Sequence, residues 1–211
     1  MDLLDHMRAY RRRASWAVWD YPTVNGSDPA LSSSAWVKDT DVIAGASLAG
    51  RLTEEVVLVS LNPASRWSRT KDSVADWAAF HDSPTDAKLA LAVRDTAAAG
   101  AFITDFVPDW SETSSVTVRA RLDQEPARVA NYVNGLREQV DLLGNPRIVC
   151  MHSAVSAYLK QHYWGDPDDL VHIYHYSHYR DGFDDPMTYR RHVHERFRKA
   201  GLRTRADDSP A

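Results

Sequence analysis

The stretch VVLVSLNPASRW, residues 56–67, decides how the rest of the chain is interpreted. Its first four residues and Leu61 are apolar, and a short run dominated by β-branched residues is typical of a buried strand. The run stops at Asn62 and Pro63, and proline cannot donate a hydrogen bond to a sheet. The sequence therefore predicts a buried strand over residues 56–61 whose end carries an amide side chain.

The chain downstream of this strand alternates between further strand and helix patterns. Glycines at or after the predicted helix ends are typical helix terminators. Strands that are separated by helices of this length pair in parallel, with helices on both faces of the sheet. We therefore expect an α/β fold, a three-layer α/β/α sandwich around a mainly parallel sheet of about four strands. The further predicted strands are residues 101–107, 147–151 and 170–174, and the predicted helices are residues 84–99, 126–143, 152–163 and 188–200.

The chain divides into three segments by composition. Residues 1–50 are mixed and rich in turn-forming residues, and we expect a helical or irregular extension that packs on the domain. Residues 51–202 carry the strand–helix alternation and form the α/β domain. Residues 203–211 are polar and form a tail.

Composition excludes several classes of protein. The 211 residues are 44% hydrophobic, which is enough for a core, and no apolar run reaches the thickness of a bilayer. The N-terminal residues do not form a secretory signal, and Cys150 is the only cysteine, so no disulfide within the chain and no four-cysteine metal site can form. We expect a cytoplasmic monomer with no membrane contact. The net charge of −4 does not favour a nucleic-acid partner, although a local basic groove is sufficient for phosphate contacts.

Polar side chains follow each predicted strand. Asn62 follows the first strand, Asp105 lies near the end of the second, His152 follows the third, and residues 175–180 (HYSHYR) follow the fourth. Ligands bind at the carboxyl ends of the strands in parallel sheets. An amide, a carboxylate, imidazoles and hydroxyls at one edge are groups that orient water and stabilise a developing anion.

Two of these strand-end motifs resemble those of the uracil-DNA glycosylase superfamily. SLNPAS, residues 60–65, is closer to the G-I-N-P-G of the mismatch-type branch than to the G-Q-D-P-Y of the uracil-specific branch. HYSHYRDGF, residues 175–183, is similar to H-P-S-P-L-S followed by a glycine–aromatic pair. The resemblance covers roughly residues 55–200. It implies a fold like that of the superfamily and hydrolysis of the N-glycosidic bond of a flipped-out pyrimidine in DNA, without a cofactor or a metal.

The resemblance assigns catalytic roles to Asn62 and His175. Asn62 lies where the superfamily positions the attacking water, and an amide can orient that water but cannot abstract its proton, so slow chemistry is implied. His175 would donate a hydrogen bond to the base O2 as the glycosidic bond breaks. The alternatives are a turn residue before proline for Asn62 and a structural histidine for His175.

The base-binding residues implied by the resemblance are Ala64, Ser65, Phe80 and Asp105. Ala64 replaces a tyrosine that blocks substituents on C5 of the pyrimidine, so the pocket would admit larger bases unless Trp67 fills the space. Phe80 would stack on the flipped base, with Trp67 and Trp77 as rivals and a core position as the alternative.

Asp105 departs from the asparagine that reads the base edge in several branches. An ionised aspartate only accepts hydrogen bonds, so it would favour an amino-bearing edge, as in cytosine, over the edge of uracil. Two alternatives stay open: a raised pKa would let Asp105 donate, and a loop carboxylate would have no contact with a base.

The resemblance also implies a DNA-binding segment after the fourth strand. Ser177 and Arg180 would hold phosphate, and Tyr179 would wedge into the base stack. The alternative is an ordinary surface loop. The spacing of His172, His175 and His178 is poor for a shared metal ion, so we predict no metal site.

The sequence leaves three functions open. The first is a glycosylase that acts on a damaged, mismatched or modified base. The second is a related protein that binds nucleic acid, single- or double-stranded, without excising a base. The third is an unrelated α/β hydrolase or transferase, which is disfavoured because G-x-S-x-G, P-loop and G-x-G-x-x-G motifs are absent from the sequence.

Overall fold

A computed structural model of the chain describes residues 3–19, 49–63, 76–77, 79–81, 85–178 and 182–204. In this part of the chain the strands form one five-stranded sheet in the order β1-β3-β2-β4-β5. Four strands are parallel, and β1 pairs with β3 in the antiparallel direction. The expected α/β class and mainly parallel sheet are therefore confirmed, with one strand more than predicted. The strands are β1 Ser15–Trp16, β2 Val56–Ser60, β3 Phe102–Asp105, β4 Arg147–Cys150 and β5 Val171–His172.

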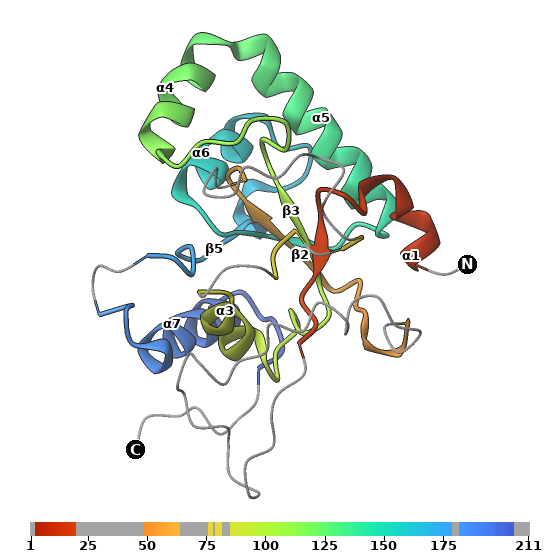
Figure 1. The fold of residues 1–211 in the computed structure, drawn as a ribbon, viewed down its shortest axis with the longest axis vertical. Helices are drawn as coiled ribbons and strands as arrows, with labels where there is room; N and C mark the ends of the chain where they lie inside the picture. The colour runs from red at the N-terminus through yellow and green to blue at the C-terminus, as the bar shows by residue number, and fades with distance from the viewer. Residues whose placement is uncertain are drawn as a thin grey trace, which may run out of the picture.

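Helices cover both faces of the sheet. Figure 1 shows α3 and α7 on one side of the strands and α4, α5 and α6 on the other. Alternate residues of each strand supply the two cores: Val57 of β2 packs into one, and Leu58 into the other. This arrangement is compatible with a three-layer sandwich. The described α-helices are α1 Leu3–His6, α3 Asp86–Val93, α4 Ser115–Gln124, α5 Pro126–Leu142, α6 Ser153–His162 and α7 Pro186–Lys199, and the described 3₁₀ helices are η1 Arg8–Tyr10, η2 Ala49–Arg51 and η4 Pro167–Asp169.

Strand register places the polar strand ends at one edge of the sheet. Ser60 of β2 lies opposite Asp105 of β3, and the pairing continues where the amide of Val107 donates to the carbonyl of Leu61. The amide of Ile173 likewise donates to the carbonyl of Cys150 and extends β5 past its last ladder residue. The carboxyl ends of β2, β3, β4 and β5 therefore point the same way.

Part of the N-terminal segment belongs to the sheet. Within residues 1–50, which the sequence places in an extension, Ser15 and Trp16 form the edge strand β1. The Trp16 side chain is fully buried, and its ring centroid lies 5.0 Å from that of Phe102 and 5.8 Å from that of Trp77. A two-residue strand is too short to produce an alternating pattern, which is why the sequence did not reveal it.

The observed helices differ from the predicted ones in two places. The helix predicted over residues 84–99 ends at Val93, because Arg94 is extended with ψ 136° and the Thr96 hydroxyl donates to the Val93 carbonyl in place of a helical bond. Helix α4 was not predicted. Its sequence is polar and buries only Val118 and Leu122, so it lacks a helical stripe of apolar residues.

The described helices include none that is both long and apolar enough to span a membrane.

Candidate functional site

The site lies at the carboxyl edge of the sheet, and Tyr176 connects its two halves. The Tyr176 ring stacks on the His175 imidazole, with centroids 4.2 Å apart, and Asp105, when it is ionised, acts electrostatically on the same phenol. Asp105 is paired through the sheet with Ser60, two residues before Asn62. Residues that follow β2, β3 and β5 are therefore grouped at one edge, as the sequence predicted from parallel strands.

Asn62 is partly buried and is held by the loop after β3. Its amide nitrogen donates to the carbonyls of Pro63 at 3.0 Å, Trp110 at 3.3 Å and Glu112 at 2.8 Å. The amide hydrogens therefore fix the loop, and the amide oxygen is the part of the side chain that can accept a hydrogen bond from a water. This geometry fits a residue that orients water and equally fits a residue that organises a turn.

His175 is fixed as a neutral hydrogen-bond donor. Its Nδ1 accepts from the Ser177 amide at 3.2 Å and lies 2.7 Å from the Ser177 hydroxyl. A ring nitrogen that accepts from an N–H carries no proton, so the proton of the neutral ring is on Nε2. Burial lowers the pKa of His175 to about 3, and His152, Lys88 and His178 lower it further in that order. The imidazole therefore stays neutral at physiological pH.

Ser177, which was predicted to hold phosphate, positions the His175 ring in this structure. Its phosphate contact stays a prediction.

Asp105 is a buried carboxyl whose raised pKa favours the protonated acid near neutral pH, which is one of the alternatives that the sequence left open. Its side chain is 5% exposed, and Oδ1 has no hydrogen-bond partner among the described residues. Burial raises the pKa of Asp105 to about 8, although a hydrogen bond with the Ser60 side chain opposes the shift. A protonated carboxyl both donates and accepts, so the sequence argument for a strictly amino-bearing base edge no longer holds.

Two charged residues of α3 lie at the site and were not predicted from the sequence. Asp86 forms a side-chain hydrogen bond with Tyr176, and the Lys88 ammonium donates to the carbonyls of His178 at 3.1 Å and Phe183 at 2.7 Å. Asp86 is 5% and Lys88 6% exposed. Two charges within an otherwise apolar helix (DAKLALAV) were the signal that could have identified them.

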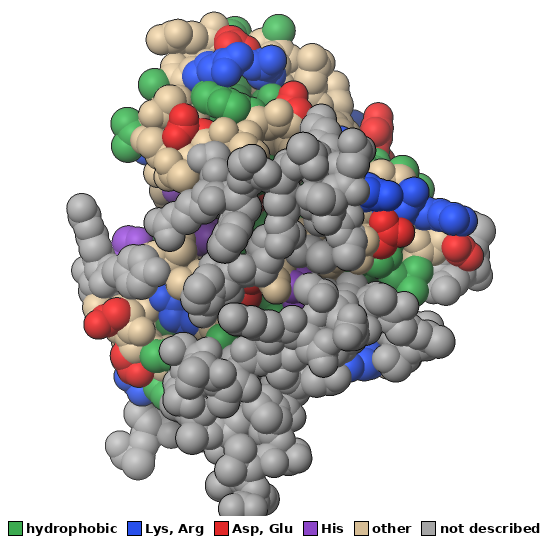
Figure 2. All heavy atoms as spheres, viewed as in Figure 1, with side chains coloured by type: hydrophobic (Ala, Val, Ile, Leu, Met, Phe, Trp, Pro, Cys, Tyr) green, Lys and Arg blue, Asp and Glu red, His purple; other side chains and the backbone are tan. Residues whose placement is uncertain are grey.

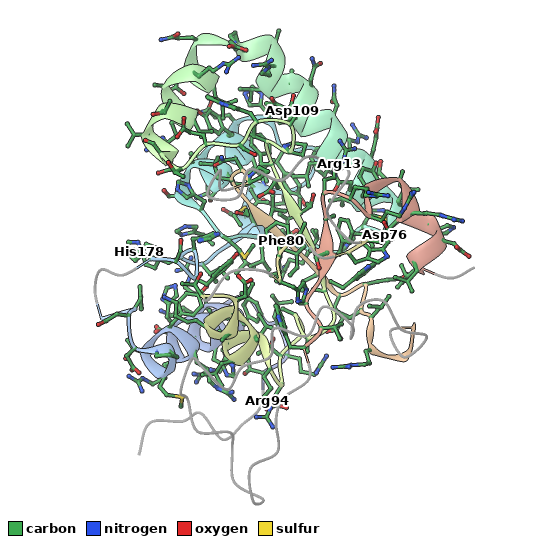
Figure 3. The ribbon with its side chains drawn as sticks, in the orientation of Figure 1. Arg13, Asp76, Phe80, Arg94, Asp109 and His178 are labelled. Carbon is green, nitrogen blue, oxygen red and sulfur yellow. The ribbon has the colours of Figure 1, made fainter. Side chains whose placement is uncertain are left out.

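Phe80 lies in the core of the molecule. Its side chain is 7% exposed and belongs to the apolar cluster on the α3 and α7 face, and Figure 3 shows it between the two helical layers. Its rival Trp77 is equally buried and packs against Trp16. Stacking of Phe80 on a base stays a prediction.

Four of the predicted site residues, and the rival Trp67, lie outside the described residues: Ala64, Ser65, Tyr179 and Arg180.

Histidines gather beside the site around Tyr174. The ring centroids of His172, His178 and His192 lie 5.6, 4.9 and 5.1 Å from that of Tyr174. Figure 2 shows histidine side chains at the level of the sheet, and Figure 3 places His178 at the β5 side. Within the described residues, no group of three or more histidine, cysteine, aspartate or glutamate side chains is arranged to hold a metal ion.

Comparisons of this chain with protein-family profiles, with curated protein sequences and with solved structures give no match.

Proposed function

We propose that the protein is a DNA glycosylase that hydrolyses the N-glycosidic bond of a flipped-out damaged, mismatched or modified pyrimidine. The observation that carries the proposal is the state of His175. A neutral imidazole whose Nδ1 accepts from Ser177 presents an Nε2–H donor at the strand-end edge, beside Tyr176 and near Asp105. Such a donor suits an oxygen on which negative charge develops.

Each residue has a defined part in the proposed reaction. Asn62 accepts a hydrogen bond from the attacking water through its amide oxygen, and His175 donates from Nε2 to the base O2 as the leaving base gains electrons. An amide is a poor base, so the water loses its proton late and the reaction is slow. The resemblance assigns base contacts to Ala64, Ser65, Phe80 and Asp105, and DNA contacts to Ser177, Tyr179 and Arg180.

The proposed substrate follows from Ala64 as well as from Asp105. Alanine leaves space beside C5, so a pyrimidine with a larger C5 group or an exocyclic amine should be released at least as well as uracil. We propose a cytoplasmic monomer that needs no metal and no cofactor for this reaction.

The decisive experiment is incubation with oligonucleotides that carry different bases, single- and double-stranded, followed by alkali cleavage at abasic sites. We expect cleavage with wild-type protein, and loss of about 100-fold or more in His175→Ala, which removes a donor to a developing anion. His162→Ala, at the end of α6, is the matched control and should retain activity. Ala64→Tyr should suppress release of a C5-substituted base far more than release of uracil. Efficient action on uracil alone would contradict the substrate assignment.

A second function, nucleic-acid binding without base excision, is favoured by Asn62. All the hydrogen bonds that its amide nitrogen makes to described residues organise the strand-end loop, as expected for a structural residue. Oligonucleotide binding by wild-type protein with no abasic site in any member of the panel would support this function and contradict the first.

A further inference from the structure

The buried carboxyl of Asp105 has one oxygen that the described part of the protein does not use. Ser60 bonds to the side chain, while Oδ1 is closed to solvent and has no hydrogen-bond partner among the described residues. An unpaired buried polar atom is costly, and at a strand-end site such an atom is available for a ligand contact. Because Oδ1 is closed to solvent in this structure, a ligand reaches it only when neighbouring groups shift.

The surroundings of Asp105 supply no described cation that would hold it ionised. Among the described residues it makes no ion pair, and it acts electrostatically on the Tyr176 phenol. From α3, Asp86 contacts the same phenol, and the Lys88 ammonium donates instead to the carbonyls of His178 and Phe183. The neighbouring His175 is neutral. The site is therefore suited to a carboxyl that keeps its proton.

We infer that Asp105 reads the edge of the bound base as a neutral carboxylic acid, and that loss of its proton switches the site from accepting both imide and amino-bearing edges to accepting amino-bearing edges only. This inference rests on the proposed function and extends it to the choice of base.

The two edges explain the switch. Uracil and thymine present a carbonyl acceptor beside an N–H donor, and a carboxylic acid satisfies both with its O–H and its C=O. Cytosine presents an amino donor beside a ring-nitrogen acceptor, and the same acid satisfies both when its O–H and its C=O exchange positions. A carboxylate has no hydrogen to donate. The imide N–H of uracil or thymine lies between two carbonyls, so a carboxylate that accepts from it also faces a carbonyl oxygen without a bond. The amino group of cytosine lies beside C5–H, so a carboxylate can accept from it while it stays clear of the ring nitrogen. With burial raising the pKa of Asp105 to about 8, the change falls just above neutral pH.

The first test measures the proton itself. Infrared difference spectra of wild-type protein against Asp105→Asn at about pH 6.5 should show the C=O band of a protonated carboxylic acid, and the band should disappear by about pH 9.5. Asp109→Asn, an exposed aspartate near the end of the same strand, is the matched control and should leave the band unchanged. Absence of the band at about pH 6.5 would overturn the inference whether or not the protein releases bases.

The second test measures the choice of base. We compare release of thymine and cytosine from otherwise identical oligonucleotides at about pH 6.5 and about pH 9. In wild-type protein the thymine-to-cytosine ratio should fall about 10-fold or more, which corresponds to one lost or repelled hydrogen bond. In Asp105→Asn the ratio should not change. The bases themselves ionise in the same way with this variant as with wild-type protein, so it also controls for the effect of pH on the substrate. A constant ratio in wild-type protein would overturn the inference.

The failure of the proposed function gives a different result. If no oligonucleotide is cleaved, the glycosylase proposal fails, and the same pair of oligonucleotides is compared by fluorescence anisotropy binding at both pH values. A wild-type affinity ratio that changes with pH, and an unchanged ratio in Asp105→Asn, would uphold the switch in a protein that only binds. Equal affinities at both pH values would overturn it.

Discussion

Asn62 uses one amide for two purposes in the proposed mechanism. Its nitrogen holds the loop of Trp110 and Glu112, and its oxygen is left to orient the water. We expect Asn62→Ala to abolish base release, because no other group in the proposed mechanism positions that water, while affinity for DNA stays largely intact. Single-turnover release and fluorescence anisotropy measure the two effects separately.

A loosened loop must be distinguished from a lost water contact. Ser114→Ala is the matched control, because Ser114 caps α4 at the other end of the same loop by accepting from the Thr117 amide at 3.3 Å. Loss of this cap should cost about 1 kcal/mol of stability and leave release nearly unchanged. If Ser114→Ala reduces release as much as Asn62→Ala does, Asn62 acts only through the loop.

Protonation states are the part of the site that the sequence could not provide. Residue types and parallel strands were enough to predict that Asn62, Asp105 and His175 lie at one edge. The neutral carboxyl of Asp105 depends on its burial, and the tautomer of His175 depends on Ser177, two residues away in a turn. Both are products of three-dimensional packing, which a strand pattern does not encode.

The Lys88 side chain of helix α3 supports the strand-end segment after β5. The Lys88 ammonium donates to the carbonyls of His178 and Phe183, which lie on either side of residues 179–181. We expect Lys88→Met to destabilise the protein by about 2–3 kcal/mol, because one buried and one partly buried carbonyl lose a charged donor. Amide exchange at residues 182–185 should accelerate by more than that of α5.

The control for this prediction is Lys160→Met, which removes an exposed lysine from α6. It should leave the midpoint of urea unfolding nearly unchanged. Equal exchange rates at residues 182–185 in wild-type protein and Lys88→Met would show that Lys88 does not hold this segment.

The elements were predictable in proportion to their length and periodicity. The strand core of β2 and the long helix α5 have strong patterns, and both were placed within a residue or two of their ends. Strand β1 has two residues and α4 has a polar sequence, so neither gave a signal. Helix α3 ends early where the Thr96 hydroxyl donates to the Val93 carbonyl, and the alanine-rich sequence around Thr96 predicts a longer helix.

Strand β1 places part of the N-terminal segment in the core of the domain. Trp16 is fully buried between Phe102 and Trp77. We expect Trp16→Ala to lower the free energy of unfolding by about 3–5 kcal/mol, the usual cost of removing a buried aromatic ring. Val116→Ala on α4, where the side chain is 75% exposed, should have almost no effect. A small change in Trp16→Ala, measured by urea unfolding, would indicate that residues 3–19 only rest on the domain.

At the scale of the whole molecule, buried histidines and one buried carboxyl act in opposite directions on stability. Burial lowers the pKa of His81, His152 and His192 to about 4 in the folded protein. Below pH 6.5 the unfolded chain therefore takes up protons that the folded chain does not, and stability falls as the pH falls. The contribution of Asp105 to stability changes with pH in the opposite direction. The folded chain keeps its proton up to about pH 8 while the unfolded chain loses it near 3.8, so stability falls as the pH rises between these values.

These signs predict a stability maximum at about pH 7, where the unfolded histidines have lost most of their protons and the cost of Asp105 is still growing. Between this maximum and about pH 8, one retained proton corresponds to a loss of about 1.4 kcal/mol per pH unit. Asp105→Asn should remove most of this alkaline slope and make stability fall more steeply on the acid side, because the Asp105 contribution also acts between pH 3.8 and the maximum, whereas Asp109→Asn should follow wild type throughout. Urea unfolding across this pH range measures the slope directly. Parallel curves for wild type and Asp105→Asn above pH 6.5 would mean that Asp105 is already ionised in the folded protein, and the inferred switch in base recognition would then lose its physical basis.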